Sequence, residues 1–338
     1  MAVLTVGAGE EFSTLGAAVS ASSGGDTILV DAGLYVDDFT TIGHALTIEG
    51  VGGLAHFLAN SSPTNGKAIM TVDADLTIGN LEFSGAAVPD GNGAGLRYEA
   101  GTLAIVNSWF HDNQNGLLAA SDPSGAISID HSEFNNNGTD TGLTHNLYVN
   151  DVASLTITNS YFHDVNVGHE IKSRAETTVI ANNVIADGPD RSASYSIDLP
   201  NGGAATITGN VIEKGAQAQN WTFISYGEEG SLHAASTLGV TDNTIINDLA
   251  SGDPTIVRNP AEAAVELANN IIYGVNASQE AIGPVTSSGN TYLSLPGPAI
   301  DTSHPFATPE PGSLGLLMLG AAVVTHWRRA HFRRAAKA

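Results

Sequence analysis

Three segments of the chain concentrate residue types that can transfer protons or bind anions. They are HNLYVND (145–151), GHEIKSRA (168–175) and YSIDLPNGG (195–203). Aligned on their apolar residues, these segments place Tyr148, Lys172 and Asp198 at one equivalent position. Asn150 and Arg174 follow two residues later in their segments. Because side chains alternate along a strand, all five are predicted to point out of the same strand face.

A second aligned set lies just before the first. It consists of His145, His169 and Tyr195. In neighbouring segments the position of Tyr148 is taken by Arg97 and Leu118 upstream, and by Ser225 and Val257 downstream. Residues that can transfer protons or bind anions therefore cluster on three consecutive segments. This is expected of a functional site on a scaffold whose other repeats carry fewer such residues.

The simplest alternative is a polar surface ladder with no catalytic role. Lys172 would then pair with Asp198, and Glu170 with Arg174. Exposed pairs of this kind contribute under ~1 kcal/mol each and are common on protein surfaces. The clustering favours function, because only seven Lys and Arg residues precede residue 328 and two of them lie here.

These residue types suit β-elimination on a uronate polysaccharide. The reaction needs a cation for the carboxylate, a base for the C5 proton and an acid for the leaving oxygen. Arg174 suits the first role by its fork geometry, Lys172 or Tyr148 the second, and His145 or His169 the third. The predicted substrate-binding residues are Asn150, Tyr195, Trp221, Tyr226 and Glu228.

Other functions remain open from the sequence. Uronate C5 epimerisation would use the same base and the same neutralising arginine. Glycoside hydrolysis needs two carboxyl groups about 5–9.5 Å apart, a pair that Asp198 with Glu170 or Glu228 would supply. A third possibility is a non-catalytic surface protein that binds exopolysaccharide or forms a rigid rod.

A repeat of 20 to 33 residues positions these segments. Its copies are LTIGNLEF (76–83), LAIVNSWF (103–110), ISIDHSEF (127–134), LTITNSYF (155–162), TVIANNVI (178–185), ATITGNVI (205–212), LGVTDNTI (238–245), VELANNII (265–272) and VTSSGNTY (285–292), with LTIEGVGG (46–53) as a degenerate copy. This period, with alternating β-favouring residues, predicts one solenoid coil per repeat. We therefore predict an all-β fold, a single-stranded right-handed parallel β-helix of about ten coils.

Two internal ladders follow from the repeat. Stacked coils bring equivalent side chains into contact, here Phe83, Phe110, Phe134 and Phe162 followed by Ile185, Ile212, Ile245 and Ile272. A second ladder is predicted at one turn, with Asn183, Asn210, Asn243, Asn270 and Asn290. Its amides are expected to satisfy backbone groups at a bend that tolerates the left-handed conformation.

The N-terminal stretch carries the signs of a capped solenoid. Residues 10–21 place apolar residues at helical spacing, which predicts a short capping helix. GGDTILVDAGLYVDD (24–38) and LTIEGVGG then resemble the opening of the pectate-lyase-like superfamily. The resemblance implies a β-helix domain over residues 1–305. The Lys172/Arg174 pair is similar to that of chondroitinase B and related alginate lyases, although their calcium-binding acidic cluster has no match here.

The charge distribution limits the partners. The net charge is −23, but five of the twelve basic residues lie within positions 328–338, which leaves seven against 35 acidic residues before them. Such a body repels nucleic acid and anionic membranes. With no cysteine, thiolate metal sites and cysteine catalysis are excluded. Calcium is a plausible ligand, but no spacing of oxygen ligands marks a site, and no metal-ligating residues are predicted.

The C-terminal segment 306–338 has a different composition. It combines Pro309, Glu310 and Pro311 with an apolar span at about 312–327 and a basic tail at 328–338. This arrangement looks like a PEP-CTERM sorting signal, with an ordinary tail anchor as the alternative. The resemblance implies export to the bacterial envelope or extracellular matrix, transient insertion of the tail into the inner membrane, and an exosortase-type partner. MAVLTVGAG shows no signal-peptide pattern, so we expect the export signal to be missing from this sequence.

Overall fold

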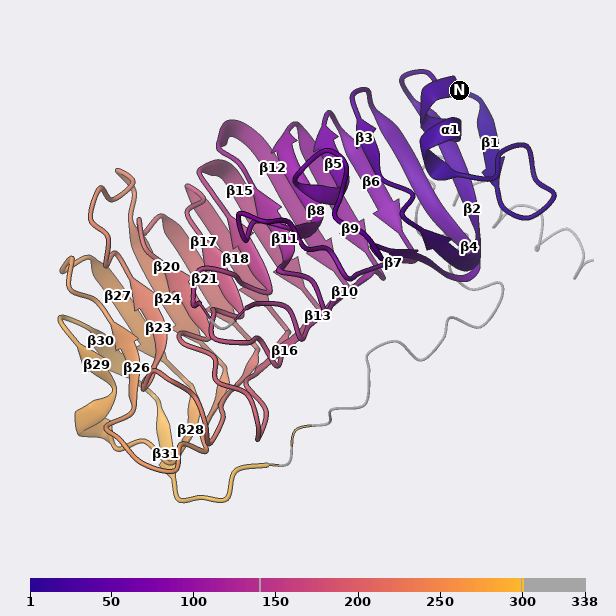
Figure 1. Cartoon of the computed structure of the whole chain (residues 1–338). Helices are drawn as coiled ribbons and strands as arrows, with labels where there is room; N and C mark the ends of the chain where they lie inside the picture. Colours follow the sequence, from indigo (N-terminus) through magenta and orange to yellow (C-terminus); the bar gives the residue numbers. More distant parts are fainter. Residues whose placement is uncertain (140, 299, 301–338) are drawn as a thin grey trace, which may run out of the picture. The chain divides into compact units, whose positions relative to one another are not determined.

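Residues 1–139, 141–298 and 300 are described by the computed structural model of the chain. They form a right-handed parallel β-helix of about ten coils, which confirms the predicted fold class. The coils stack from α1 at the N-terminal end to β29 and β31 at the other end (Figure 1). The chain divides into units Met1–Pro305 and Phe306–Ala338. The predicted sorting motif Pro309, Glu310 and Pro311, the apolar span and the basic tail lie outside the described residues.

Each coil contributes strands to three faces, and every strand pairing is parallel. The first face contains β1 (Val3–Val6), β2 (Asp26–Val36), β4 (Leu46–Leu58), β6 (Leu76–Gly79), β9 (Thr102–Val106), β12 (Asp122–Asp130), β15 (Val152–Thr158), β18 (Thr177–Ala181), β21 (Ala204–Thr208), β24 (Thr237–Thr241), β27 (Ala264–Ala268) and β30 (Thr286–Ser288). The second face begins with the C-terminal halves of β2 and β4. It continues through β7 (Leu81–Ser84), β10 (Trp109–His111), β13 (Glu133–Asn135), β16 (Tyr161–His163), β19 (Val184–Ala186), β22 (Val211–Lys214), β25 (Thr244–Asn247), β28 (Ile271–Tyr273) and β31 (Thr291–Leu293).

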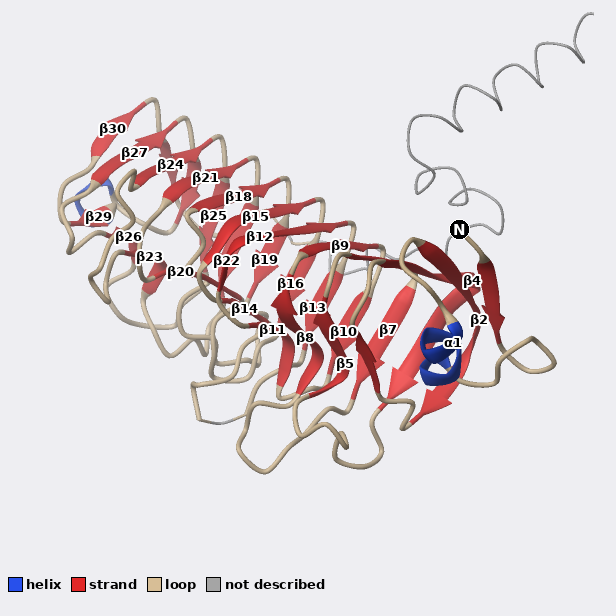
Figure 2. Ribbon diagram, turned by 90° about the horizontal axis from the view of Figure 1, so that it is seen from above, coloured by secondary structure: helices blue, strands red, loops and turns tan. Residues whose placement is uncertain are grey.

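The third face is a separate ten-stranded sheet. Its strands are β3 (Thr40–Ile42), β5 (Ala68–Asp73), β8 (Ala94–Ala100), β11 (Asn115–Ala119), β14 (Leu147–Val149), β17 (Ile171–Ser173), β20 (Ile197–Leu199), β23 (Thr222–Tyr226), β26 (Thr255–Arg258) and β29 (Ala281–Ile282). A short 3-10 helix, η1 (Ala277–Gln279), precedes β29. Figure 2 shows how completely strands dominate, with α1 as the helix at the N-terminal end.

The capping helix is shorter than predicted. α1 spans Leu15–Ala21 and is capped by Thr14, whose hydroxyl accepts a hydrogen bond from the Ala17 N–H. The residues before it form a turn, because Phe12 pairs with the β1 backbone instead of entering the helix. Leu15 faces the core and is fully buried. Within the described residues, the structure contains no helix of the length and apolarity that a membrane crossing requires.

The predicted aromatic ladder fills the core. Phe83, Phe110, Phe134 and Phe162 are fully buried, and successive ring centroids lie 4.6–4.9 Å apart in stacked geometry. Phe162 pairs in register with Ile185, where the isoleucine ladder begins. Stacked rings of this kind add about 0.5–1.5 kcal/mol per pair to the burial term. The Phe ladder and the Ile ladder that follows it therefore help to fix the register of the coils that carry the candidate site.

The asparagine ladder is also confirmed, with one correction. Asn183, Asn210, Asn243 and Asn270 each donate from Nδ2 to a backbone carbonyl and to the next asparagine Oδ1, at 2.9–3.0 Å. The left-handed conformation, however, is adopted one residue earlier, for example at Asn182 with φ 58°. The ladder residues themselves satisfy the buried backbone of the turn, as expected for buried polar groups.

Asn210→Ala is expected to lower the free energy of unfolding by about 1–3 kcal/mol, because buried backbone partners lose their hydrogen bonds. Asn210 is 1% exposed and contacts both adjacent coils. Asn60→Ala, at an exposed position, serves as the control. Urea unfolding measures both variants, and equal stabilities would contradict the structural role of the ladder.

Candidate active site

The predicted register of the three reactive segments is what the structure shows on the third face. Tyr148 on β14 pairs with Lys172 on β17, which pairs with Asp198 on β20. The apolar neighbours Leu147, Ile171 and Ile197 are buried inside the coil. Strand alternation therefore turns the reactive side chains outward, as the spacing predicts.

The downstream end of this row needs a correction. Asp198 pairs with Ser225 on β23, and Ser225 pairs with Arg258 on β26. The predicted residue, Val257, instead pairs with Ile224 and is fully buried. A register error of one residue moves a side chain to the opposite face of the strand. The outward row thus has the cation Arg258 on β26, where an apolar residue was predicted.

A carboxylate lies between the two cations of the site. Lys172 Nζ lies 2.9 Å from Asp198 Oδ2 and 3.2 Å from Glu229 Oε1. Arg174 Nη2 donates to the other Glu229 oxygen at 2.6 Å. The side chains of Lys172 and Arg174 are 12% and 19% exposed, whereas that of Glu229 is 48% exposed. An exposed carboxylate is therefore held by two largely buried cations.

Arg174 connects this anion site to a phenol. Its Nε donates to Tyr148 Oη at 2.9 Å, and its Nη1 donates to Asn201 Oδ1. Asn201 is held in turn by its own Nδ2, which donates to the Gly230 carbonyl at 2.9 Å. Lys172 Nζ also lies 5.7 Å from the centroid of the Tyr148 ring. Arg174 thus donates one N–H to the Glu229 carboxylate and another to the Tyr148 phenol oxygen.

The carboxylates respond differently to these cations. Burial raises the pKa of Asp198, although the Lys172 charge opposes the shift. For Glu229, partial burial alone would raise the pKa, but hydrogen bonds from Arg174 and the charge of Lys172 lower it. Glu229 is therefore anionic at neutral pH.

The two histidines stack as predicted, but their surroundings argue against the predicted acid role. The rings of His145 and His169 lie 4.8 Å apart, and the Tyr195 ring follows at 5.2 Å from His169. His145 Nδ1 accepts from the His169 N–H, and His169 Nδ1 accepts from the Tyr195 N–H. Each neutral ring therefore carries its proton on Nε2.

Burial is the main reason why both histidines stay neutral. Together with the charges of Lys172 and Arg174, it lowers the pKa of His145 to about 3. Burial and the neighbouring His145 also hold the pKa of His169 well below its usual value. The 3.5 Å contact between His169 Nε2 and Asp198 Oδ2 is therefore made by a neutral ring, not by an ion pair.

A pH-dependent loss of stability follows from these lowered pKa values. In the unfolded chain both histidines take up a proton near pH 6.5, whereas the folded chain resists this until a much lower pH. The free energy of unfolding is expected to fall as the pH drops from about 6.5 toward 3, and to fall less in His145→Gln. Urea unfolding across this range measures the difference, with exposed His131→Gln as control. Parallel curves for wild type and His145→Gln would refute the assignment.

Among the predicted substrate-binding residues, Tyr195, Glu228 and Trp221 border the outward row. Tyr195 Oη donates to Glu228 Oε2 at 2.9 Å, and Arg258 Nε donates to Glu228 Oε1 at 2.6 Å. The Arg258 hydrogen bond lowers the pKa of Glu228 against the effect of partial burial. Trp221 is 50% exposed and lines a hollow together with Arg258. These residues extend the site along the coil stack.

Three other predictions are not supported. Tyr226 is fully buried, and its hydroxyl donates to the Gly203 carbonyl, so it cannot contact a polymer. The Asn150 side-chain oxygen accepts a hydrogen bond from the neighbouring Asp151 N–H, so this oxygen is already engaged. Glu170 is fully buried and accepts from Asn146 and the Val165 N–H. Glu170 therefore neither pairs with Arg174 nor serves as a carboxylate for hydrolysis.

Three residues that complete the cluster were not assigned to the site from the sequence. Glu229 comes from the turn after β23, where Gly227 and Gly230 adopt positive φ angles. Asn201 comes from the turn after β20, and Arg258 from β26. The adjacent Gly-Glu-Glu-Gly letters were the only available signal, since turns of variable length break the repeat alignment. Calcium fits this cluster poorly, because Asp198, Glu228 and Glu229 each face a Lys or Arg.

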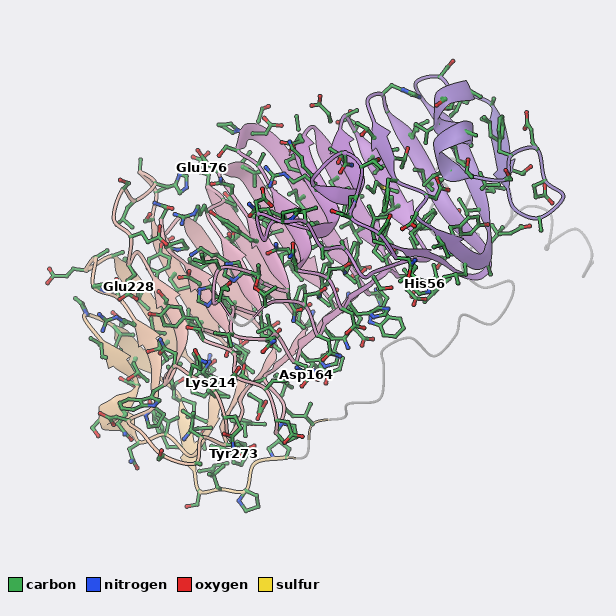
Figure 3. The ribbon with its side chains drawn as sticks, in the orientation of Figure 1. His56, Asp164, Glu176, Lys214, Glu228 and Tyr273 are labelled. Carbon is green, nitrogen blue, oxygen red and sulfur yellow. The ribbon has the colours of Figure 1, made fainter. Side chains whose placement is uncertain are left out.

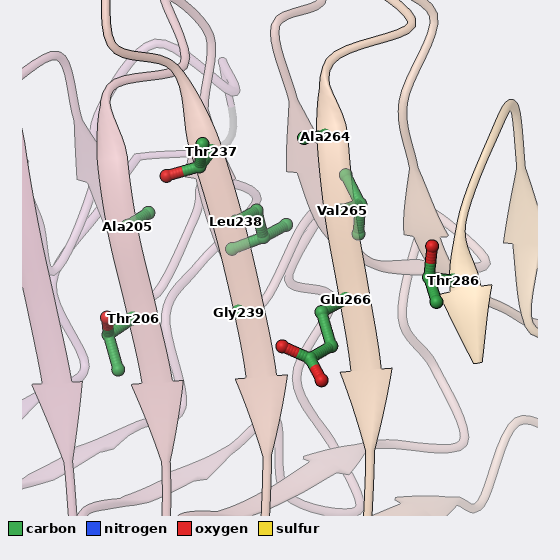
Figure 4. A pocket seen from close by; sticks show the side chains of 9 residues that line it. All are labelled: Ala205, Thr206, Thr237, Leu238, Gly239, Ala264, Val265, Glu266 and Thr286. Atoms are coloured by element: carbon green, nitrogen blue, oxygen red, sulfur yellow. The ribbon is translucent and has the colours of Figure 1, made fainter. Parts of the chain in front are cut away.

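A second hollow on the first face lacks these features. It lies over β21, β24, β27 and β30, where Gly239 leaves the strand surface open between Thr206 and Glu266 (Figure 4). Glu266 is the one charged side chain in its lining. This hollow has no cation to hold an anionic sugar.

Residues 307–330 match the family model for the PEP-CTERM protein-sorting motif. This match implies that the chain is exported and anchored in the cell envelope. No curated protein matches the chain in sequence.

Solved structures of two lyases and a biosidase share the fold. An alginate lyase from Paenibacillus sp. str. FPU-7 has a TM-score of 0.61 at 16% identity, covering 86% of this chain and 99% of that one. Pectate lyase Pel9A has a TM-score of 0.57 at 14% identity, covering 86% and 78%. A lacto-N-biosidase from Eubacterium ramulus has a TM-score of 0.52 at 12% identity, covering 87% and 68%. These likenesses show the parallel β-helix fold alone.

Proposed function

We propose that the chain acts on an extracellular uronate polysaccharide by removing the C5 proton, as a lyase or a C5 epimerase. The observation that carries this proposal is the Glu229 carboxylate held by Lys172 and Arg174 beside the Tyr148 phenol. We interpret the Glu229 oxygens as occupying the place of a uronate carboxylate. A substrate carboxylate there would put the adjacent sugar carbon close to the phenol.

The chemistry begins with proton transfer to Tyr148. Tyr148 Oη accepts the Arg174 Nε–H, which positions this oxygen beside the carboxylate site, where the deprotonated phenol would accept the C5 proton. The electrons of the broken C5–H bond move toward the uronate carboxyl group, and the charges of Arg174 and Lys172 stabilise the resulting anion. In this scheme Lys172 is a cation rather than the base.

The second half of the reaction separates the two activities. In a lyase, the C5 electrons form a double bond to C4 while the C4–O bond breaks. Tyr148 then returns its proton to the leaving oxygen, so that atoms and charges balance. In an epimerase, C4–O stays intact and a second donor protonates C5 from the opposite face. Both begin with the same proton removal, which is why we propose them together.

The carboxylates support glycoside hydrolysis less well. That reaction needs an acid and a base or nucleophile facing one glycosidic bond. Glu170 is buried inside the coil, Asp198 is 3% exposed against Lys172, and Glu228 is tied to Arg258. None of these carboxyl groups is free to reach a sugar.

The sorting motif supports an extracellular location for this reaction. We infer that an exosortase-type enzyme processes the tail, as the motif match at residues 307–330 implies. The polysaccharide would then be encountered outside the cell, where the strongly acidic body does not attract nucleic acid.

A substrate screen tests the proposed function. The purified full chain is incubated with alginate, pectate, hyaluronan and the exopolysaccharide of its host. Unsaturated uronates are followed by ultraviolet absorbance, and C5 inversion by NMR. We expect one of these two products with at least one polymer. Binding without either product, or new reducing ends alone, would overturn the proposal.

Glu229→Gln is expected to lower KM for the uronate polymer severalfold. The native carboxylate competes with the substrate for Lys172 and Arg174, and the amide removes that negative charge while keeping its shape. Glu176→Gln, at an exposed glutamate in the turn after β17 that is labelled in Figure 3, is the matched control. An unchanged or raised KM in Glu229→Gln would contradict the idea that Glu229 occupies the carboxylate site.

A further inference from the structure

A second cluster of ligating side chains lies on the second face, on three consecutive coils. His56 extends from β4, Glu82 from β7 and His111 from β10. Glu82 Oε1 lies 3.3 Å from His56 Nδ1 and 3.1 Å from His111 Nε2. All three ligand atoms lie within 4.8 Å of one another. Figure 3 labels His56 and Glu228, which mark this cluster and the candidate active site on separate parts of the stack.

Hydrogen bonds orient both imidazoles of this cluster. His56 Nε2 lies 2.6 Å from Ser84 Oγ, and His111 Nδ1 lies 2.7 Å from Asp112 Oδ2. Each imidazole therefore forms a hydrogen bond to Ser84 or Asp112 through one nitrogen, and its other nitrogen faces Glu82. This is the arrangement of metal-bound histidines, whose second nitrogen is usually held by a carboxylate, a carbonyl or water.

The separations also suit a small tetrahedral ion. With metal–nitrogen bonds of about 2.0–2.1 Å, tetrahedral ligands lie roughly 3.3–3.4 Å apart. The two contacts with Glu82 are close to that value. The three side chains are 14–25% exposed, so an ion can reach them from solvent.

We propose that His56, Glu82 and His111 form a site for a divalent transition metal of the zinc class. Two imidazoles and one carboxylate are ligands that Zn²⁺ prefers, and three protein ligands leave a fourth position for water. The acidic body attracts cations to the surface in general, but only nitrogen ligands favour zinc over calcium.

The same face contains a natural comparison that lacks one ligand. His163 Nε2 lies 3.0 Å from Glu133 Oε1, and His163 Nδ1 lies 2.6 Å from Asp164 Oδ2. This pair repeats the geometry of Glu82, His111 and Asp112 two coils further along. The position that corresponds to His56 is occupied by Trp109, which pairs in register with Glu133. The second pair is therefore an ion pair without the two-histidine set.

Metal binding would hold three consecutive coils together in the N-terminal half of the solenoid and so stabilise the folded chain. Ligands that bind only the folded chain raise its stability in proportion to the logarithm of their concentration. The proposed site does not depend on the proposed uronate chemistry, since it shares no residue with the Tyr148 and Arg174 cluster. The bound ion would link side chains from three consecutive coils.

The test uses the full chain without a histidine tag, stripped by a chelator and dialysed. Zn²⁺ titration by calorimetry is expected to give one ion per chain, and Co²⁺ is expected to give the intense visible absorption of a tetrahedral centre. Zn²⁺ is expected to raise the midpoint of thermal unfolding. His56→Ala should weaken zinc binding by more than about a hundredfold.

Two further variants keep the result unambiguous. Glu82→Gln preserves the size of the side chain and should also abolish tight zinc binding. If both His56→Ala and Glu82→Gln lose tight binding, the cavity that the alanine creates is not the cause. His163→Ala removes the histidine of the comparison pair and should leave zinc binding unchanged. Absence of tight binding in the wild type, or equal binding in His56→Ala and His163→Ala, would overturn the proposal. Circular dichroism verifies that each variant is folded.

Discussion

Arg174→Ala is expected to lower kcat/KM on the uronate polysaccharide by about a thousandfold. The guanidinium supplies the charge that stabilises the developing anion, and it also holds Tyr148 and Glu229. Its loss therefore removes both an electrostatic contribution and the positioning of the base. Steady-state kinetics on the polymer identified by the screen measures the effect.

Arg97→Ala is the matched control for this prediction. Arg97 stands in the outward row of Tyr148 and Lys172, two coils before Tyr148, and its exposure is similar to that of Arg174. It pairs with Glu99 instead of with the cluster. Its removal is expected to leave the rate unchanged within about twofold, since surface pairs contribute little. A comparable loss in both variants would show that Arg174 acts through general surface charge, which would contradict its proposed role.

Tyr148→Phe is expected to lower kcat by ~10²–10⁴-fold with little change in KM. The substitution removes the proton-transferring oxygen but keeps the ring that packs near Lys172 and His145. Since the cations still bind the substrate carboxylate, affinity should be retained.

Tyr273→Phe on the second face provides the control, because its phenol is remote from the cluster on β14 and β17. Kinetics and binding are measured separately for both variants. If Tyr148→Phe raised KM while leaving kcat intact, Tyr148 would be a binding residue, and Lys172 would have to be reconsidered as the base.

Much of the fold was predictable because each coil must bury the same apolar positions and satisfy the same turn backbone groups. Buried Phe and Ile ladders, and turn asparagines that satisfy backbone groups, recur at fixed positions. Strand alternation then determined which residues face outward, so the row of Tyr148, Lys172 and Asp198 followed from the repeat.

The remainder of the site depends on features that do not repeat. Glu229 and Asn201 come from turns, and Val257 was misplaced by one residue because the coil before it has an unusually long turn. The burial of Tyr226 and the proton-accepting contacts of His145 depend on neighbouring coils, which strand spacing does not reveal. The sequence did not predict that His56 lies beside Glu82, because β4 continues through a corner where the repeat is degenerate.

Proton NMR in deuterated water tests the central claim, that the Tyr148 and Arg174 cluster removes the C5 proton of a uronate. The wild-type chain is expected to give either a new vinyl signal from an unsaturated uronate or deuterium at an inverted C5. Both signals should be lost in Tyr148→Phe. New reducing ends with the C5 proton fully retained would contradict the account and point to hydrolysis.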